Sequence, residues 1–127
     1  MFHVEKEYQG KLDEISDKLL VHLRTEGYVV VADIDVKSIL KRALNFGFKD
    51  YHIYEICKPE AAREIIGDDD LNGLFVPCKM IVYQDGPVTK LRLLKSSVIV
   101  NRFYSKAESL IRKYEDELVK VIESFQP

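Results

Sequence analysis

The sequence contains no long apolar run, few cysteines and almost no excess of charge of either sign. Its 127 residues include two cysteines, and 19 basic residues oppose 21 acidic ones. No stretch approaches the roughly 20 apolar residues of a membrane-spanning helix, and Met1–Lys6 lacks the basic start and apolar centre of a signal peptide. The near balance of charge argues against a broad surface for nucleic acid or anionic membrane. We therefore expect a cytoplasmic protein that binds neither.

Familiar catalytic and metal-binding signatures are also missing. The sequence has no P-loop, GxGxxG, GxSxG or HExxH motif. Its cysteines are not spaced as CxxC, and His3, His22 and His52 are scattered, which disfavours a zinc site. Asp68–Asp70 lacks the twelve-residue pattern of a calcium loop and is typical of a solvated turn. Whether the protein is an enzyme, and which cofactor it uses, stay unknown from the sequence.

What is present indicates one globular domain spanning residues 1–127. With 46% hydrophobic and 31% charged residues, the chain has enough apolar material for a core and enough charge to solvate its surface. At this length a chain buries roughly two-thirds of its unfolded surface and folds without disulfide bonds or structural metal ions. No internal repeat, low-complexity tract or flexible linker divides it.

Apolar residues at helical spacing, with suitable caps, predict the helices. Asp35 is a cap, and Pro59 suits a first helical position because its missing N–H needs no partner there. Ser105–Glu108 reads as a capping box in front of a long apolar stripe. The predicted helices run from Leu12 to a stop at Gly27, from Asp35 to about Asn45–Gly47, from Pro59 to Gly67, and over about Ser105–Phe125.

Short runs rich in β-branched and aromatic residues predict the strands. The predicted strands are Phe2–Tyr8, Tyr28–Ala32, Tyr51–Cys57, Leu74–Tyr83, Val88–Leu94 and Val98–Val100, with a loop over Asp68–Gly73. Asp85-Gly86 between two of them indicates a hairpin. We therefore expect an α+β fold, with helices packed on one face of a mostly antiparallel sheet and a long C-terminal helix.

The two cysteines are the candidate functional residues. Cys57 and Cys78 each lie within two residues of a proline, and a lysine follows each. If their strands are neighbours, both sulfurs converge on one pocket. Three uses then stay open: a reversible disulfide, a two-thiolate contribution to a soft-metal site, or a thiol nucleophile. The competing interpretation is that both are small apolar residues of the core.

Charged neighbours refine this hypothesis. The helix start at Pro59, together with Lys58 and Lys79, should favour thiolates and an anionic ligand such as a phosphate or carboxylate. Glu55 shares a strand face with Cys57 and is a candidate proton acceptor or cation partner, whereas alternation puts His52 on the other face.

Several short sequence motifs, taken in their order along the chain, resemble those of one known family. They are Gly27-Tyr28, Ile34-Asp35-Val36, Cys57-Lys58-Pro59 and Pro77-Cys78, followed by a valine-rich hairpin. In this order they resemble the prokaryotic family called domain of unknown function 302, over about Glu5–Leu94. The resemblance implies a compact α+β domain similar in layout to the saddle-like TATA-binding-protein fold, often homodimeric, with no agreed activity. The family commonly has asparagine where this chain has Lys58 and Lys79, and the helix from Ser105 lies beyond the resembling region.

Two functional classes follow. The first is a small soluble ligand-binding or thiol-active domain whose pocket contains Cys57, Lys58, Pro77, Cys78 and Lys79, with the cysteines also candidate metal ligands. The second is a structural or interaction module with inert cysteines. In either case we expect a homodimer, because the C-terminal stripe offers more apolar positions than one small sheet needs to cover.

Overall fold

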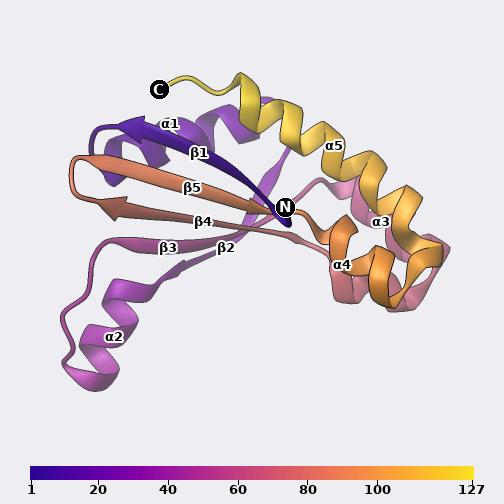
Figure 1. Ribbon diagram of the computed structural model, residues 1–127, viewed down its shortest axis with the longest axis horizontal. Helices are drawn as coiled ribbons and strands as arrows, with labels where there is room; N and C mark the ends of the chain where they lie inside the picture. Colours follow the sequence, from indigo (N-terminus) through magenta and orange to yellow (C-terminus); the bar gives the residue numbers. More distant parts are fainter.

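The computed structural model describes residues 1–127, and a five-stranded antiparallel sheet organises it. The strands are β1 (His3–Gln9), β2 (Val29–Asp35), β3 (Tyr51–Cys57), β4 (Cys78–Asp85) and β5 (Val88–Leu94), in the spatial order β1-β5-β4-β3-β2. The helices are α1 (Leu12–Thr25), α2 (Val36–Leu44), α3 (Pro59–Asp68), α4 (Ser96–Phe103) and α5 (Glu108–Ser124), with 3-10 turns η1 (Asp70–Phe75) and η2 (Ser105–Ala107). The predicted α+β fold with a long C-terminal helix is confirmed (Figure 1).

The main core lies between the sheet and the two helices on one of its faces, α1 and α5 (Figure 1). Strand alternation turns Ile56, Met80 and Leu91 toward these helices, and all three are buried. The apolar stripe of α5 covers them with Leu118 and Ile122. The stripe is therefore used within the chain, so it no longer argues for a partner on this helix.

Several local expectations were confirmed. The Asp35 carboxylate accepts a hydrogen bond from the Ser38 N–H at 3.1 Å and caps α2, which ends at Asn45 in a left-handed conformation. Pro59 occupies the first turn of α3. The β4–β5 hairpin turns at Gly86-Pro87, directly after Asp85, and Gly86 has a positive φ of 59°. These positions were predictable because the backbone conformation each requires restricts the residue type.

Three expectations were wrong. Val98–Val100 belongs to α4. Val100 packs into a second small core, whereas Val98 and Ile99 are both partly exposed, and two exposed residues in a row do not fit the alternation of a strand. Ser105 opens the turn η2 instead of a capping box, and α5 starts at Glu108 without a side-chain cap. The predicted Asp68–Gly73 loop contains most of η1, so β4 begins only at Cys78.

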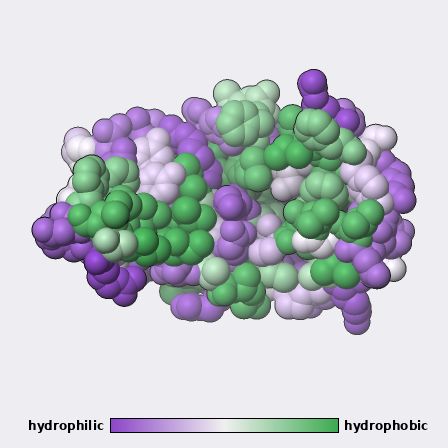
Figure 2. Space-filling model, turned by 90° about the horizontal axis from the view of Figure 1, so that it is seen from below, coloured by the Kyte–Doolittle hydropathy of each residue, from purple (hydrophilic) through white to green (hydrophobic).

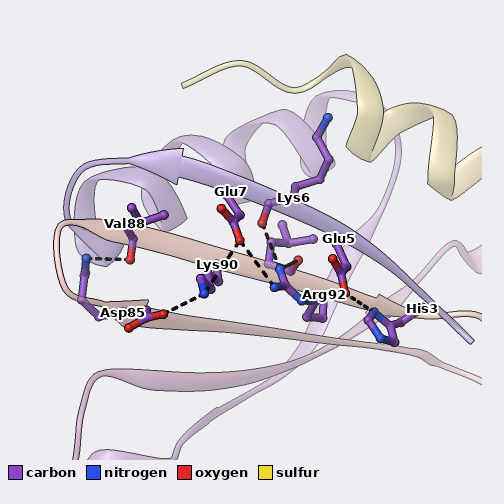
Figure 3. Close-up of polar contacts among 10 residues, drawn as sticks. His3, Glu5, Lys6, Glu7, Asp85, Val88, Lys90 and Arg92 are labelled. Atoms are coloured by element: carbon purple, nitrogen blue, oxygen red, sulfur yellow. Dashed lines mark hydrogen bonds and ion pairs between the residues drawn. The ribbon is translucent and has the colours of Figure 1, made fainter. Parts of the chain in front are cut away.

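The sheet face away from α1 and α5 carries charged pairs. Figure 3 shows Lys90 and Arg92 on β5 among acidic side chains of β1 and the hairpin. Lys90 Nζ lies 2.7 Å from the Asp85 carboxylate, and Arg92 Nη2 lies 3.7 Å from that of Glu7. Such exposed pairs stabilise a fold only slightly, but they make the middle of this face hydrophilic.

Candidate functional site

Sheet register places the two cysteines on neighbouring strands, one residue out of step. β3 and β4 are neighbours, with Ile56 of β3 directly opposite Cys78 of β4. Cys57 is the next residue, which strand alternation assigns to the other face, but it ends β3 just before α3 begins at Pro59. The strands are thus adjacent, as the hypothesis of two converging sulfurs requires.

Both cysteines line one small, mostly apolar cavity of about 40 Å³ at this end of the sheet. Twelve of its 16 lining residues are hydrophobic. The lining is Tyr28, Ile56, Cys57, Lys58, Ala61, Ala62, Ile65, Phe75, Val76, Pro77, Cys78, Ser96, Ile111, Tyr114, Glu115 and Leu118. A volume of this size admits a few water molecules or one ion, and is far below the several hundred Å³ of an ordinary organic-ligand pocket. We call it the cysteine cavity.

The other candidate residues separate into two groups. Lys58 lines the cysteine cavity, but its Nζ lies 3.2 Å from the Glu117 carboxylate and 5.4 Å from the centre of the Tyr28 ring. Glu55 and Lys79 face each other across β3 and β4 on the opposite side of the sheet, with their charged groups 3.6 Å apart. Alternation causes this separation, because Lys79 follows Cys78 directly.

Both thiols are held in the protonated form. Burial, and then the negative charge of Glu60, raise the pKa of Cys57. Burial, followed by the charges of Glu115, Cys57 and Glu55, raises the pKa of Cys78 to about 11. Both pKa values are raised, whereas the start of α3 and the two lysines were expected to lower them. Desolvation of the thiols and the acidic neighbours outweigh the positive charge of the helix start and the lysines.

Glu115 was not predicted as a site residue. It is only 4% exposed and lines the cysteine cavity from α5. Its carboxylate accepts a hydrogen bond from the Ser97 N–H at 3.0 Å and another from the Ser97 hydroxyl. The available sequence signal was a charged residue between Ile111 and Leu118, inside an otherwise apolar stripe. A buried carboxylate without a paired cation gives the cavity a negative local charge.

The remaining polar candidates have structural partners. The Asp33 carboxylate lies 2.6 Å from His52 Nδ1 on the neighbouring strand, and His22 Nε2 lies 2.9 Å from the Val121 carbonyl oxygen. Asp69 accepts a hydrogen bond from the Leu71 N–H and caps η1. No group of three or more His, Cys, Asp and Glu side chains is placed to hold a metal ion.

The raised pKa of Cys78 predicts a loss of stability in base. An unfolded thiol titrates near its ordinary value of 9.0, whereas the folded one titrates near 11. The folded chain retains a proton that the unfolded chain loses, so this contribution is complete below pH 9 and disappears as the pH rises to about 11. The melting temperature of the wild type should therefore fall more steeply over this range than that of Cys78→Ala. If the melting temperatures of the two proteins fall in parallel with pH, the raised pKa of Cys78 is wrong. The comparison also removes the effect of Tyr8 and Tyr28, whose pKa values burial raises to about 12, because both proteins contain these residues.

A solved structure shares this architecture. The crystal structure of the uncharacterized conserved protein DUF302 from Bacillus stearothermophilus matches with a TM-score of 0.86 and 26% identity, over 97% of each chain. No curated protein matches the sequence. None of the helices is both long and apolar enough to span a membrane.

The family match extends further than the sequence marks indicated. It covers residues 4–125 and so includes α5, which corrects the expectation that the family-like region ends near Leu94. The extension has a physical basis, because α5 supplies Leu118 and Ile122 to the core and Glu115 to the cysteine cavity. The chain belongs to the family described as Domain of unknown function DUF302.

Proposed function

We propose that this domain binds a soft metal ion, Cu(I) being the biologically abundant example, between the sulfurs of Cys57 and Cys78. The observation that carries the proposal is that both cysteines, from two neighbouring strands, line the same small apolar cavity. Thiolate sulfur is the ligand that Cu(I) prefers. No catalytic step is assigned to the site.

The charges around the cavity offer little to a free anionic ligand. Glu115 is buried in the lining, and acidic groups raise the pKa of both thiols. Lys58 already interacts with Glu117, and Lys79 lies on the other side of the sheet. Because the positive charges expected beside the sulfurs are engaged elsewhere, a phosphate or carboxylate gains little there. Lys58 still lines the cavity and offers a countercharge to the singly negative Cu(I)–dithiolate unit.

The number of ligands distinguishes the metal. A structural zinc ion requires four ligands in a tetrahedron, whereas only two side chains of this cavity carry sulfur and no cluster of three metal-binding side chains is present. Two-coordinate binding through two thiolates is compatible with a monovalent soft ion. The small cavity volume fits an ion better than an organic ligand.

An anaerobic titration with Cu(I) against a competing chelator tests the proposal. We expect one ion per chain, and a loss of affinity of at least about 100-fold in each of Cys57→Ser and Cys78→Ser, since a lost ligand costs more than the 10- to 100-fold typical of an outer partner. Lys79→Ala, on the other side of the sheet, is the matched control and should bind normally. Unchanged affinity in the double serine variant, or no binding by the wild type, would favour the interaction module with inert cysteines.

The pH dependence provides a second, independent readout. Both thiols are protonated at neutral pH, so each bound ion releases two protons, one from each sulfur. The logarithm of the apparent association constant should therefore rise by about two for each pH unit between pH 6 and 8. A slope near one would mean that a single cysteine binds the ion, and a slope of zero would exclude thiolate binding.

A further inference from the structure

α2 and the loop that follows it form a segment that the rest of the chain leaves largely uncovered. No residue of α2 is buried, and positions 41–49 are all exposed. The segment projects away from α1 and α5 (Figure 1). Its exposed large apolar side chains, which we call the α2 patch, are Ile39, Leu44, Phe46 and Phe48. Apolar side chains that gather on a projecting surface mark an interaction site, whereas single exposed ones do not.

The same segment is strongly basic, although the net charge of the whole chain is −2. Residues 36–49 include no acidic residue, and their basic residues are Lys37, Lys41, Arg42 and Lys49. Of these four, only Lys37 has a carboxylate partner, Asp50 at 3.1 Å. Lys41 donates to a neutral amide oxygen, and neither Arg42 nor Lys49 is in an ion pair. Positive charge that the chain itself does not neutralise therefore surrounds the α2 patch.

The helical period puts the apolar and basic side chains of α2 on adjoining strips. Ile39 and Leu44 fall at the two borders of one apolar arc, where Arg42 lies next to Ile39 and Lys41 lies beyond Leu44. The exposed rings of Phe46 and Phe48, with centroids 6.5 Å apart, extend the apolar surface past the end of the helix. Figure 2, which views the side from which α2 projects, shows apolar surface at its left end with hydrophilic groups at the edges.

We propose that the α2 patch binds the surface of an anionic lipid bilayer. Leu44, Phe46 and Phe48 enter the boundary between headgroups and acyl chains, and Arg42 and Lys49 lie among the lipid phosphates. An apolar strip bordered by basic side chains is the pattern of a helix that lies in this boundary, because long basic side chains reach the headgroups while the apolar strip is covered. The near balance of charge over the whole chain argued against a broad membrane-binding surface, but this one is local.

Two observations favour a bilayer over a protein as the occupant. The segment projects from the body of the molecule (Figure 1), and a projection enters a fluid boundary without needing a groove of matching shape. Its charges are also all of one sign, which suits a surface that is negative throughout. An acidic protein with a complementary groove, or a second copy of this chain, is the alternative that the experiment must exclude.

Co-sedimentation with vesicles of phosphatidylcholine, with and without phosphatidylglycerol, tests the proposal. We expect the wild type to bind only the vesicles that contain phosphatidylglycerol, and to bind them less as salt is added. The partition coefficient should fall about 20-fold in the double variant Arg42→Ala/Lys49→Ala, at about fivefold for each charge. It should fall at least about tenfold in Phe46→Ser. These side chains are exposed, so the circular dichroism spectra should stay native.

The matched controls alter similar side chains elsewhere on the surface. Lys120→Ala removes an exposed basic residue of α5, and Leu74→Ser removes an apolar side chain that is 79% exposed on η1. Both controls should bind vesicles as the wild type does. The proposal is overturned if the wild type binds neither kind of vesicle, if it binds both equally, or if the controls weaken binding as much as the α2 variants do. In the first case the α2 patch is a protein-docking surface.

A fluorescent reporter locates the inserted side chains. The chain contains no tryptophan, so Phe46→Trp introduces a single reporter in the α2 patch. Its emission should shift to shorter wavelength on vesicles that contain phosphatidylglycerol and should be quenched by lipids brominated on their acyl chains. Phe103→Trp, at a position that is 73% exposed on α4, is the control and should show neither change. Equal shifts of both reporters would show that the protein adsorbs without using α2, and the proposal would fail.

Discussion

Replacing Ile122 by alanine is expected to lower the free energy of unfolding by about 2–5 kcal/mol, the cost of an isoleucine-sized void in a close-packed core. Ile122 is fully buried where α5 covers the sheet. For a domain of this size such a loss corresponds to a fall in melting temperature of roughly 6–25 °C. Thermal and urea unfolding of the two proteins at equal concentration would measure it.

The control for this variant is Val21→Ala. Val21 is 52% exposed on the outer side of α1 and should change the unfolding free energy by no more than about 0.5 kcal/mol. The comparison also tests where the C-terminal stripe is used. If Ile122→Ala leaves the unfolding of the dilute chain unchanged and weakens only self-association, α5 faces a partner and the core described above is wrong.

The second large effect is expected at Glu115. Glu115→Gln keeps the shape of the side chain and an acceptor for the Ser97 N–H, but it removes the negative charge that helps to raise the pKa of Cys78. Each unit by which that pKa falls increases the thiolate fraction at pH 8 about tenfold. Alkylation of Cys78 by iodoacetamide, measured in a Cys57→Ser background, should therefore accelerate several-fold.

Ser97→Ala separates charge from packing in this experiment. It removes the hydroxyl donor to Glu115 and leaves the carboxylate in place, so it should destabilise the chain by about 1–3 kcal/mol without accelerating alkylation of Cys78. Should both variants accelerate the reaction to the same extent, local opening of the cavity is the cause, and the charge of Glu115 does not set the reactivity of the thiol.

Much of the fold was predictable because single residues restrict the local backbone. Asp35 could be assigned as a cap, Pro59 as a helix start and Asp85-Gly86 as a hairpin turn without knowledge of their neighbours. The run Val98–Val100 had no such marker. Three apolar residues fit a strand or a helix equally well, and only the packing of Val100 into the small core against α5 decides between them.

The candidate site was less predictable because distant elements set its chemistry. The sequence placed Cys57 at the end of one predicted strand and Cys78 within another, but burial of Cys78 and the approach of Glu115 from α5 raise the pKa of its thiol. Lys79 is adjacent to Cys78 in the chain, and strand alternation nevertheless places it across the sheet. Proximity in sequence was therefore a poor guide to the charge around the sulfurs.

The segment Phe75–Pro77 lines the cysteine cavity and also an open hollow over the other face of the sheet. One stretch of backbone thus forms a wall shared by the proposed metal site and this hollow. If an ion in the cavity shifts this wall, a molecule bound in the hollow changes the affinity for the ion by the same factor, because linkage between two binding events is reciprocal. Amide hydrogen exchange at Val76 with and without Cu(I) would report whether the wall moves.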